Sequence, residues 1–114
     1  PFNVNYIAQK MAVASLEDEK YLKRSLELND SGMKFLKLEL NKLGIPYLNT
    51  YTNFITMHLG PKTQKVYEIL LSEGVILRPL ENYGLPSYLR VTIGTKEENN
   101  MFVKKLKKSL KELK

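Results

Sequence analysis

Residues 74–95 of this chain read GVILRPLENYGLPSYLRVTIGT, with arginines at positions 78 and 90. Two runs of strand-forming residues, 75–78 and 88–93, each contain one arginine in an otherwise apolar setting. The connector at 82–86 is rich in turn-forming residues, which predicts that the second run folds back beside the first. Guanidinium groups bind carboxylate or phosphate through two parallel hydrogen bonds. The stretch therefore predicts two neighbouring strands that carry an anion-binding arginine pair, Arg78 and Arg90.

The alternation of side chains along a strand gives Arg90 its expected orientation. Leu89, Val91 and Ile93 are predicted to face the core, which leaves Arg90 on the opposite face, toward a cleft. The alternative is a purely structural arginine, paired with Glu81 or Glu97.

Arg78 is followed directly by a proline, which favours an extended backbone and removes one ladder hydrogen bond. This pattern predicts a strand end beside a cleft. The alternative is an ordinary arginine on the solvent face of a strand. One arginine suffices for a carboxylate, whereas a dianionic phosphate benefits from two, so the pair favours an organophosphate.

The remaining chain predicts a small α+β domain with the element order α-α-β-α-β-β-α. Asn5 is expected to cap a helix that ends near Ala14, and a second helix begins near residues 16–18 and runs to Leu43. Glycine weakens a helix by about 1 kcal/mol relative to alanine, so a bend or break at Gly32 is the alternative to an uninterrupted helix. A strand over 53–59, a helix over 62–72 and a final helix from residue 96 complete a mostly antiparallel three-stranded sheet with helices on one face.

Composition narrows the functional classes. The 114 residues fit one domain, 1–114, and 43% apolar residues is ordinary for a globular protein. The sequence has no cysteine, so it has no thiolate metal site, disulfide or cysteine nucleophile, which fits a reducing cytoplasm. No apolar run approaches the roughly 20 residues of a membrane span, and residues 1–5 do not resemble a signal peptide. A start on Pro1 suggests a fragment of a longer protein.

The net charge of +6 raises the alternative of a basic module that binds nucleic acid or another protein. Much of this charge lies in residues 96–114, where lysines surround one apolar helical stripe. No aromatic residues are interleaved with these lysines to stack on bases. We therefore interpret them as a solvated helix face and expect neither a nucleic-acid nor a membrane partner.

Other polar residues are weaker candidates. Asn3 and Asn5 are candidates for bonding across a domain junction, although Asn5 is better explained as a helix cap. His58 is the only histidine, and we interpret it as a structural residue rather than a catalytic one. Tyr83 precedes Gly84 in a predicted turn and is a candidate for stacking near a substrate.

These patterns together resemble the C-terminal small domain of the histidinol-phosphate aminotransferases, which are pyridoxal-phosphate enzymes of aminotransferase fold type I. Residues 83–98 carry the most specific similarity. The other similar segments are residues 1–5 with Ala8 and Gln9, 43–46 with 53–55, and Gly94 and Thr95 with 97–99. The resemblance implies that residues 1–15 form an interdomain helix region.

The resemblance also implies functions for the arginine pair. Arg90 matches the arginine that holds the acidic group of the substrate, and Arg78 matches a second phosphate-binding arginine. The implied substrates are histidinol phosphate and glutamate, and the implied parent is a cytoplasmic homodimer. The cofactor lysine, its aspartate partner and the phosphate-binding turn of the family do not appear in these 114 residues, so we expect pyridoxal phosphate only in the full-length parent and no activity in the fragment alone. Rival interpretations of the same class are an aminotransferase for aromatic amino acids and a phosphothreonine decarboxylase.

Overall fold

The computed structural model describes residues 3–113. The main elements are four helices and three strands, joined in part by two short 3-10 turns at Gly60–Lys62 and Glu81–Tyr83. In chain order, the helices and strands are α1 (Tyr6–Glu17), α2 (Glu19–Lys42), β1 (Phe54–His58), α3 (Thr63–Ser72), β2 (Arg78–Leu80), β3 (Leu85–Thr92) and α4 (Lys96–Glu112). The predicted order and the α+β class are confirmed.

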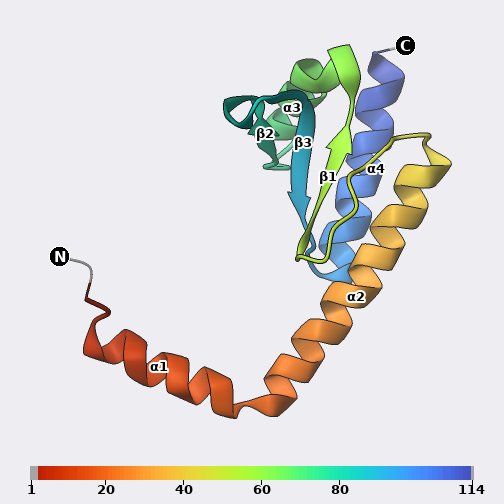
Figure 1. Ribbon diagram of the computed structural model, residues 1–114. Coiled ribbons are helices and arrows are strands. Elements are labelled where there is room, and N and C mark those ends of the chain that lie inside the picture. Colours follow the sequence, from red (N-terminus) through yellow and green to blue (C-terminus); the bar gives the residue numbers. More distant parts are fainter. Residues whose placement is uncertain (1–2, 114) are drawn as a thin grey trace.

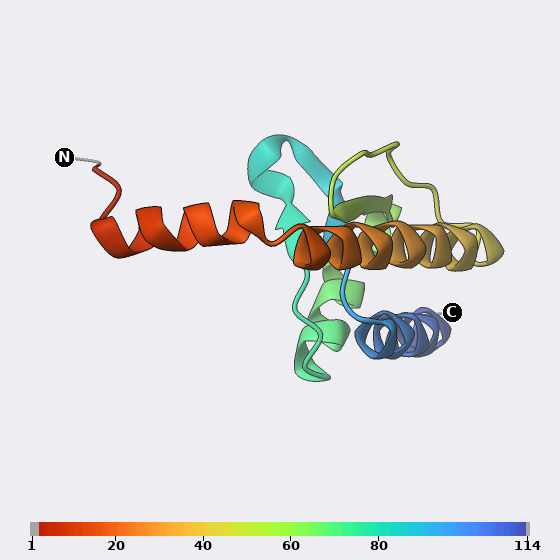
Figure 2. The same ribbon diagram turned by 90° about the horizontal axis from the view of Figure 1, so that it is seen from below.

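The sheet places β3 in the centre, with β1 and β2 on its two sides, and both pairings are antiparallel. Helices α2, α3 and α4 cover one face of the sheet, whereas α1 extends away from the body (Figure 1). Seen from below, α1 again lies apart from the sheet (Figure 2). None of its residues is buried. The prediction of helices on one face is therefore confirmed for α2, α3 and α4 only.

The core lies between the sheet and these three helices. β1 contributes Ile55 and Met57, and β3 contributes Leu89 and Val91. The helices contribute apolar residues at helical spacing, because only one stripe of each helix faces the sheet: Leu36 and Leu40, Val66 and Leu70, and Phe102, Val103 and Leu106. The alternation along β3 thus directs Leu89 and Val91 inward and leaves Arg90 on the open face, as predicted.

Helix boundaries follow the local capping signals. The Asn5 side chain accepts a hydrogen bond from the Ala8 amide at 2.8 Å, so its predicted role as a cap is confirmed. Asp18 caps α2 in the same way, through the Tyr21 amide. α1 continues to Glu17, three residues beyond the predicted end. Thr95 and Glu98 form a capping box at the start of α4.

Gly32 does not break α2, so the alternative of a broken helix at this position is wrong. The helix is continuous from Glu19 to Lys42, and Gly32 is buried within it. A β-carbon built at this position would lie 2.5 Å from Ile93 Cγ2 and 2.9 Å from Asn99 Nδ2. The glycine is thus a point of close approach between α2 and the junction of β3 with α4. The contact, rather than helix propensity, explains why glycine stands there.

The strand predicted at 75–78 is displaced toward the C-terminus. β2 begins only at Arg78 and ends at Leu80, whereas β3 begins three residues earlier than predicted. Val75 is held at the end of α3, where its amide donates to the Leu70 carbonyl. The β2–β3 ladder therefore does not extend over residues 75–77, and a groove lies between residues 74–79 and residues 90–94. Residues 75–77 still alternate between core and solvent, as in a strand.

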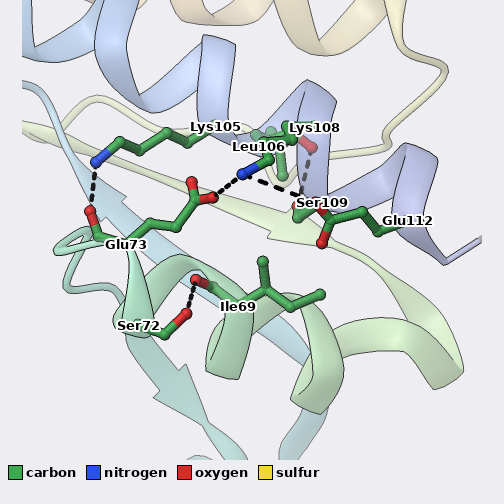
Figure 3. A network of polar contacts seen from close by, with 8 residues as sticks. All are labelled: Ile69, Ser72, Glu73, Lys105, Leu106, Lys108, Ser109 and Glu112. Atoms are coloured by element: carbon green, nitrogen blue, oxygen red, sulfur yellow. Dashed lines mark hydrogen bonds and ion pairs between the residues drawn. The ribbon is translucent and has the colours of Figure 1, made fainter.

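The lysines of α4 tie this helix to its neighbours. Lys108 pairs with the Glu73 carboxylate at 2.5 Å, and Lys105 donates to the Glu73 carbonyl (Figure 3). On α2, Glu39 is buried and accepts from Lys107 at 2.5 Å and from Lys42 at 2.6 Å. These hydrogen bonds from Lys107 and Lys42 hold the pKa of Glu39 below its ordinary value.

The close approach at Gly32 generates the first prediction. Gly32→Ala should destabilise the fold by about 1–3 kcal/mol, because the strain of overpacking exceeds the gain of about 1 kcal/mol in helix propensity. Chemical denaturation of wild type and variant measures the difference. Ser31→Ala, at the exposed neighbouring position of the same helix, is the matched control and should change stability by less than about 0.5 kcal/mol.

A double variant tests the cause of that loss. In an Ile93→Ala background, the methyl group at position 32 no longer meets Ile93 Cγ2, so Gly32→Ala should cost less than it does in wild type. Equal costs in the two backgrounds would contradict the steric explanation.

The Glu39 contacts generate a pH prediction. Because the folded-state pKa of Glu39 is lowered, its stabilisation is fully present above the ordinary pKa of 4.5 and is lost as the pH falls through the folded-state value. Glu39→Gln should therefore be less stable than wild type at pH 7, and the difference should shrink below about pH 4.5. Denaturation midpoints from pH 3 to pH 7 measure it. Asp30→Asn, which removes an exposed pair with Lys34, is the control and should have little effect.

Candidate anion-binding site

The arginine pair lies at a single position of the sheet. Arg78 of β2 stands directly opposite Arg90 of the antiparallel β3. Residues opposite one another in an antiparallel pair have Cα atoms about 4.5–5.5 Å apart, with both side chains on the same face. This face is the one that α2, α3 and α4 leave uncovered. The prediction that the two arginines occupy neighbouring antiparallel strands and share a face is confirmed.

Each guanidinium lies over an aromatic ring. The Arg90 guanidinium carbon is 4.8 Å from the ring centroid of Phe54, and that of Arg78 is 5.7 Å from the ring centroid of Tyr83. In the pairing of β1 with β3, Arg90 stands opposite Thr56. Phe54 lies two residues before Thr56 on β1, so it is the diagonal cross-strand neighbour of Arg90. A cation–π contact at an exposed site stabilises by about 0.5–1 kcal/mol. The rings thus orient the two guanidinium groups.

Neither arginine is neutralised by a carboxylate. Within residues 3–113, none of the ion pairs includes Arg78 or Arg90, so the alternative pairing of Arg90 with Glu81 or Glu97 does not occur there. Like charges repel, and the contacts with Phe54 and Tyr83 favour the presence of both cations on this face. The site therefore carries two positive charges available to an anion.

Both arginines line an open groove of about 640 Å³. Its walls come from residues 74–79 on one side and from 90–94 with the first turns of α4 on the other. Leu77 and Val91 are buried beneath, and Ile76 beside Arg78 is exposed. The groove exists because β2 is short: the missing ladder over 75–77 leaves room next to the arginine pair.

Tyr83 is brought to Arg78 by the hairpin connector. The turn Glu81–Tyr83 ends at Gly84, whose φ of 74° reverses the chain into β3. The register also shifts between Pro79 and Leu80, directly after Arg78. As a result, Arg78 Nη2 donates to the Tyr83 hydroxyl oxygen at 3.0 Å.

Sequence reasoning identified both arginines but missed the contribution of Phe54. It named Phe54 only as part of a strand, because the contact depends on the register between β1 and β3. His58, at the end of β1, packs its ring against Tyr88 at a centroid distance of 4.8 Å, which agrees with a structural role. Asn3 is exposed, and its suggested bond across a domain junction stays a prediction.

The expectation that this chain alone does not bind pyridoxal phosphate stays a prediction. An internal aldimine requires a lysine, and an acidic residue must face the pyridinium nitrogen. Among residues 3–113, no lysine is buried, and none lines the groove beside the arginine pair. The same residues contain no cluster of three or more metal-ligating His, Asp or Glu side chains. The groove contains two guanidinium groups, which can bind and orient an anion, and it is also lined by Glu98 and Asn99, whose side chains bond the backbone of Thr95 and Gly94.

Three lysines of the basic helix α4 already have partners within the fold. Lys105 and Lys108 contact Glu73, and Lys107 contacts Glu39, as described above. Lys104 and Lys111 remain exposed on the outer face. These contacts support the interpretation of α4 as a solvated face with structural ion pairs, and the absence of a nucleic-acid partner stays a prediction. No helix in the described part of the chain has the length and apolar character needed to cross a bilayer.

Comparison with known proteins identifies the family. Residues 1–106 match the model of the family "Aminotransferase class I and II". The chain is 45% identical over 108 residues to a histidinol-phosphate aminotransferase 1 of Idiomarina loihiensis, covering 95% of the chain and 29% of that protein. It is 47% identical over 110 residues to a histidinol-phosphate aminotransferase 2 of Pseudomonas fluorescens, covering 96% of the chain and 30% of that protein.

Solved structures agree with this assignment. The crystal structure of the histidinol-phosphate aminotransferase from Clostridium acetobutylicum superposes with a TM-score of 0.84 at 32% identity, over 94% of this chain and 34% of that one. This chain thus spans about a third or less of the length of the relatives it matches. With the sequence match and the fold in agreement, the chain belongs to the class I and II aminotransferases.

Proposed function

We propose that this chain is the C-terminal small domain of a histidinol-phosphate aminotransferase. The parent would interconvert histidinol phosphate and 2-oxoglutarate with imidazole-acetol phosphate and glutamate, in histidine biosynthesis. The observation that carries the proposal is the arginine pair, held in direct register on an open face with no carboxylate partner in the described residues. The similarity to histidinol-phosphate aminotransferases supports the choice of substrate.

The charge of the arginine pair matches that of the proposed substrate. A phosphate monoester carries about −1.5 to −2 charge at pH 7, and Arg78 and Arg90 together carry +2. Each guanidinium presents a planar set of donors to two phosphate oxygens at once. We propose that Arg90 also takes a carboxylate of glutamate, because both substrates visit the same site in turn, whereas Arg78 is needed only for the phosphate.

The parent would supply what this chain lacks. Pyridoxal phosphate provides the electron sink for amino-group transfer when it is bound, and we propose that its binding residues lie in the part of the parent outside this chain. In this scheme, the 114 residues contribute substrate binding and orientation, and the isolated chain is inactive.

We also propose that the rest of the parent covers the exposed apolar residues of α1 and the start of α2. Ile7, Met11, Leu16, Leu22 and Leu26 are each more than half exposed. The interdomain position that we propose for residues 1–15 accounts for the exposure of Ile7 and Met11, and we propose that the same cover extends to Leu16 and to the start of α2. A cytoplasmic homodimer is our proposal for the assembled parent, and light scattering of the full-length protein tests its oligomeric state.

The substrate proposal is tested by arginine variants of the full-length parent. Hydrogen bonds to charged groups contribute about 1.5–3 kcal/mol, so Arg90→Ala should lower kcat/KM by at least about tenfold for both substrates. Arg78→Ala should lower kcat/KM for histidinol phosphate more than for glutamate. Lysine at either position should restore little, because it lacks the planar pair of donors. Lys65→Ala removes an exposed cation of α3; it is the control and should leave both values unchanged.

The result for Arg78 decides between a binding and a structural role. Equal losses for both substrates, or no loss for either, would show that Arg78 is structural. Activity of the wild-type parent with phenylalanine rather than histidinol phosphate would favour an aminotransferase for aromatic amino acids. Decarboxylation of a phosphorylated amino acid would favour the decarboxylase alternative.

The cofactor proposal has its own test. The isolated chain, incubated with pyridoxal phosphate and reduced with borohydride, should show no single lysine labelled stoichiometrically, because no lysine of the described residues is buried in a cofactor-like pocket. Mass spectrometry of peptides measures the labelling. One lysine labelled in a one-to-one ratio would overturn the assignment of the cofactor site to the remainder of the parent.

A further inference from the structure

The two arginines of the pair have different aromatic neighbours. Arg90 lies over Phe54, which offers only a ring, whereas Arg78 lies over Tyr83 and also donates to its hydroxyl oxygen at 3.0 Å. Tyr83 is 62% exposed, so its hydroxyl remains accessible from the open face. This asymmetry sets the Arg78 side of the site apart from the Arg90 side.

A phenol is both a donor and an acceptor. While the Tyr83 oxygen accepts from Arg78 Nη2, its own proton stays free to be donated. Phe54 has no such proton. A phosphate that binds the Arg78 guanidinium lies adjacent to the Tyr83 hydroxyl, and the additional oxygens of a phosphate accept more donors than a carboxylate does. Tyr83 thus adds one donor to those of Arg78, whereas the Phe54 ring adds none to those of Arg90.

We propose that Tyr83 is a further binding residue for the phosphate group, with two separable contributions. Its ring holds the Arg78 guanidinium in place, and its hydroxyl donates to a phosphate oxygen. Arg78 and Tyr83 together then select phosphate, whereas Arg90 on Phe54 accepts either phosphate or carboxylate. The inference rests on the proposed function for the identity of the substrate, but the binding of a phosphate group at Tyr83 is testable without it.

The local backbone supports this role for Tyr83. The turn Glu81–Tyr83 and the left-handed Gly84 lie within the connector between the strands that carry the arginine pair. The register shift after Pro79 lets this turn fold back toward Arg78, five residues earlier in the chain. The side chain is thus positioned by the same hairpin that positions both arginines.

The test uses the full-length holoenzyme with two probes, inorganic phosphate as a competitive inhibitor and glutamate as the carboxylate substrate. Tyr83→Phe removes only the hydroxyl, and it should weaken phosphate inhibition by about tenfold. Tyr83→Leu also removes the ring, and it should weaken inhibition further. Both variants should keep the KM of glutamate within about twofold of wild type. If Tyr83 had only a structural role, its variants would change phosphate inhibition and the KM of glutamate to a similar extent.

Tyr88→Phe is the matched control. Tyr88 lies on the same strand as Arg90 and packs on His58, so this variant also removes one phenol hydroxyl, yet both probes should behave as in wild type. Arg78→Ala serves as the reference for loss of the phosphate site.

The outcomes distinguish this inference from the proposed function. If Arg78→Ala abolishes phosphate inhibition while Tyr83→Phe and Tyr83→Leu leave it unchanged, the arginine pair stands and the role of Tyr83 is overturned. If Tyr83→Phe weakens phosphate and glutamate equally, the selectivity of the Arg78 side is overturned. If wild type shows no phosphate inhibition at all, the phosphate-binding role of the arginine pair fails, and that of Tyr83 fails with it.

Discussion

The register between β2 and β3 is the constraint on which the site depends. Because Arg78 pairs with Arg90, two positive charges share one face of the sheet, opposite the apolar face made by Leu89 and Val91. A slip of one residue would turn an arginine into the core and expose an apolar neighbour. Burial of an unpaired charge and exposure of an apolar side chain both cost free energy. The burial of the core face therefore fixes the position of the arginine pair on the open face.

The arginine pair is held in place without carboxylates. Ion pairs would have oriented the guanidinium groups, but they would also have neutralised the charge that an anion needs. Phe54 and Tyr83 orient the same groups through their rings and leave the charge in place. The carboxylates Glu39 and Glu73 instead engage the lysines of α4, on the helical side of the sheet. The chain thus separates its structural ion pairs from its anion-binding charges.

The junction between β3 and α4 connects the core to the site. The Asn99 side chain is buried and bonds both the amide and the carbonyl of Gly94, at 3.0 Å and 2.9 Å. Gly32 of α2 approaches this junction so closely that a β-carbon would clash with Ile93. These contacts fix where β3 ends and where α4 begins. They also place the first turns of α4 along one wall of the groove beside Arg90.

Much of the fold follows from local sequence. The cap at Asn5, the apolar spacing of α2, α3 and α4, and the alternation around Arg90 are local signals, and each predicted the element found. The pairing of the two arginine strands also followed, since a turn-rich connector joins them directly. The sequence therefore determined the class of fold, the order of its elements and the two arginines of the candidate site.

Tertiary structure decided what depends on contacts between distant segments. The start of β2 at Arg78 rather than at Val75 depends on the end of α3, where the Val75 amide donates to the Leu70 carbonyl. The close approach that favours glycine at position 32 depends on Ile93, which lies 61 residues later in the chain. The ring beneath Arg90 comes from β1, and only the register of the sheet brings Phe54 to it. Propensity and periodicity report on neighbours along the chain, so they do not determine contacts whose partners are set by packing.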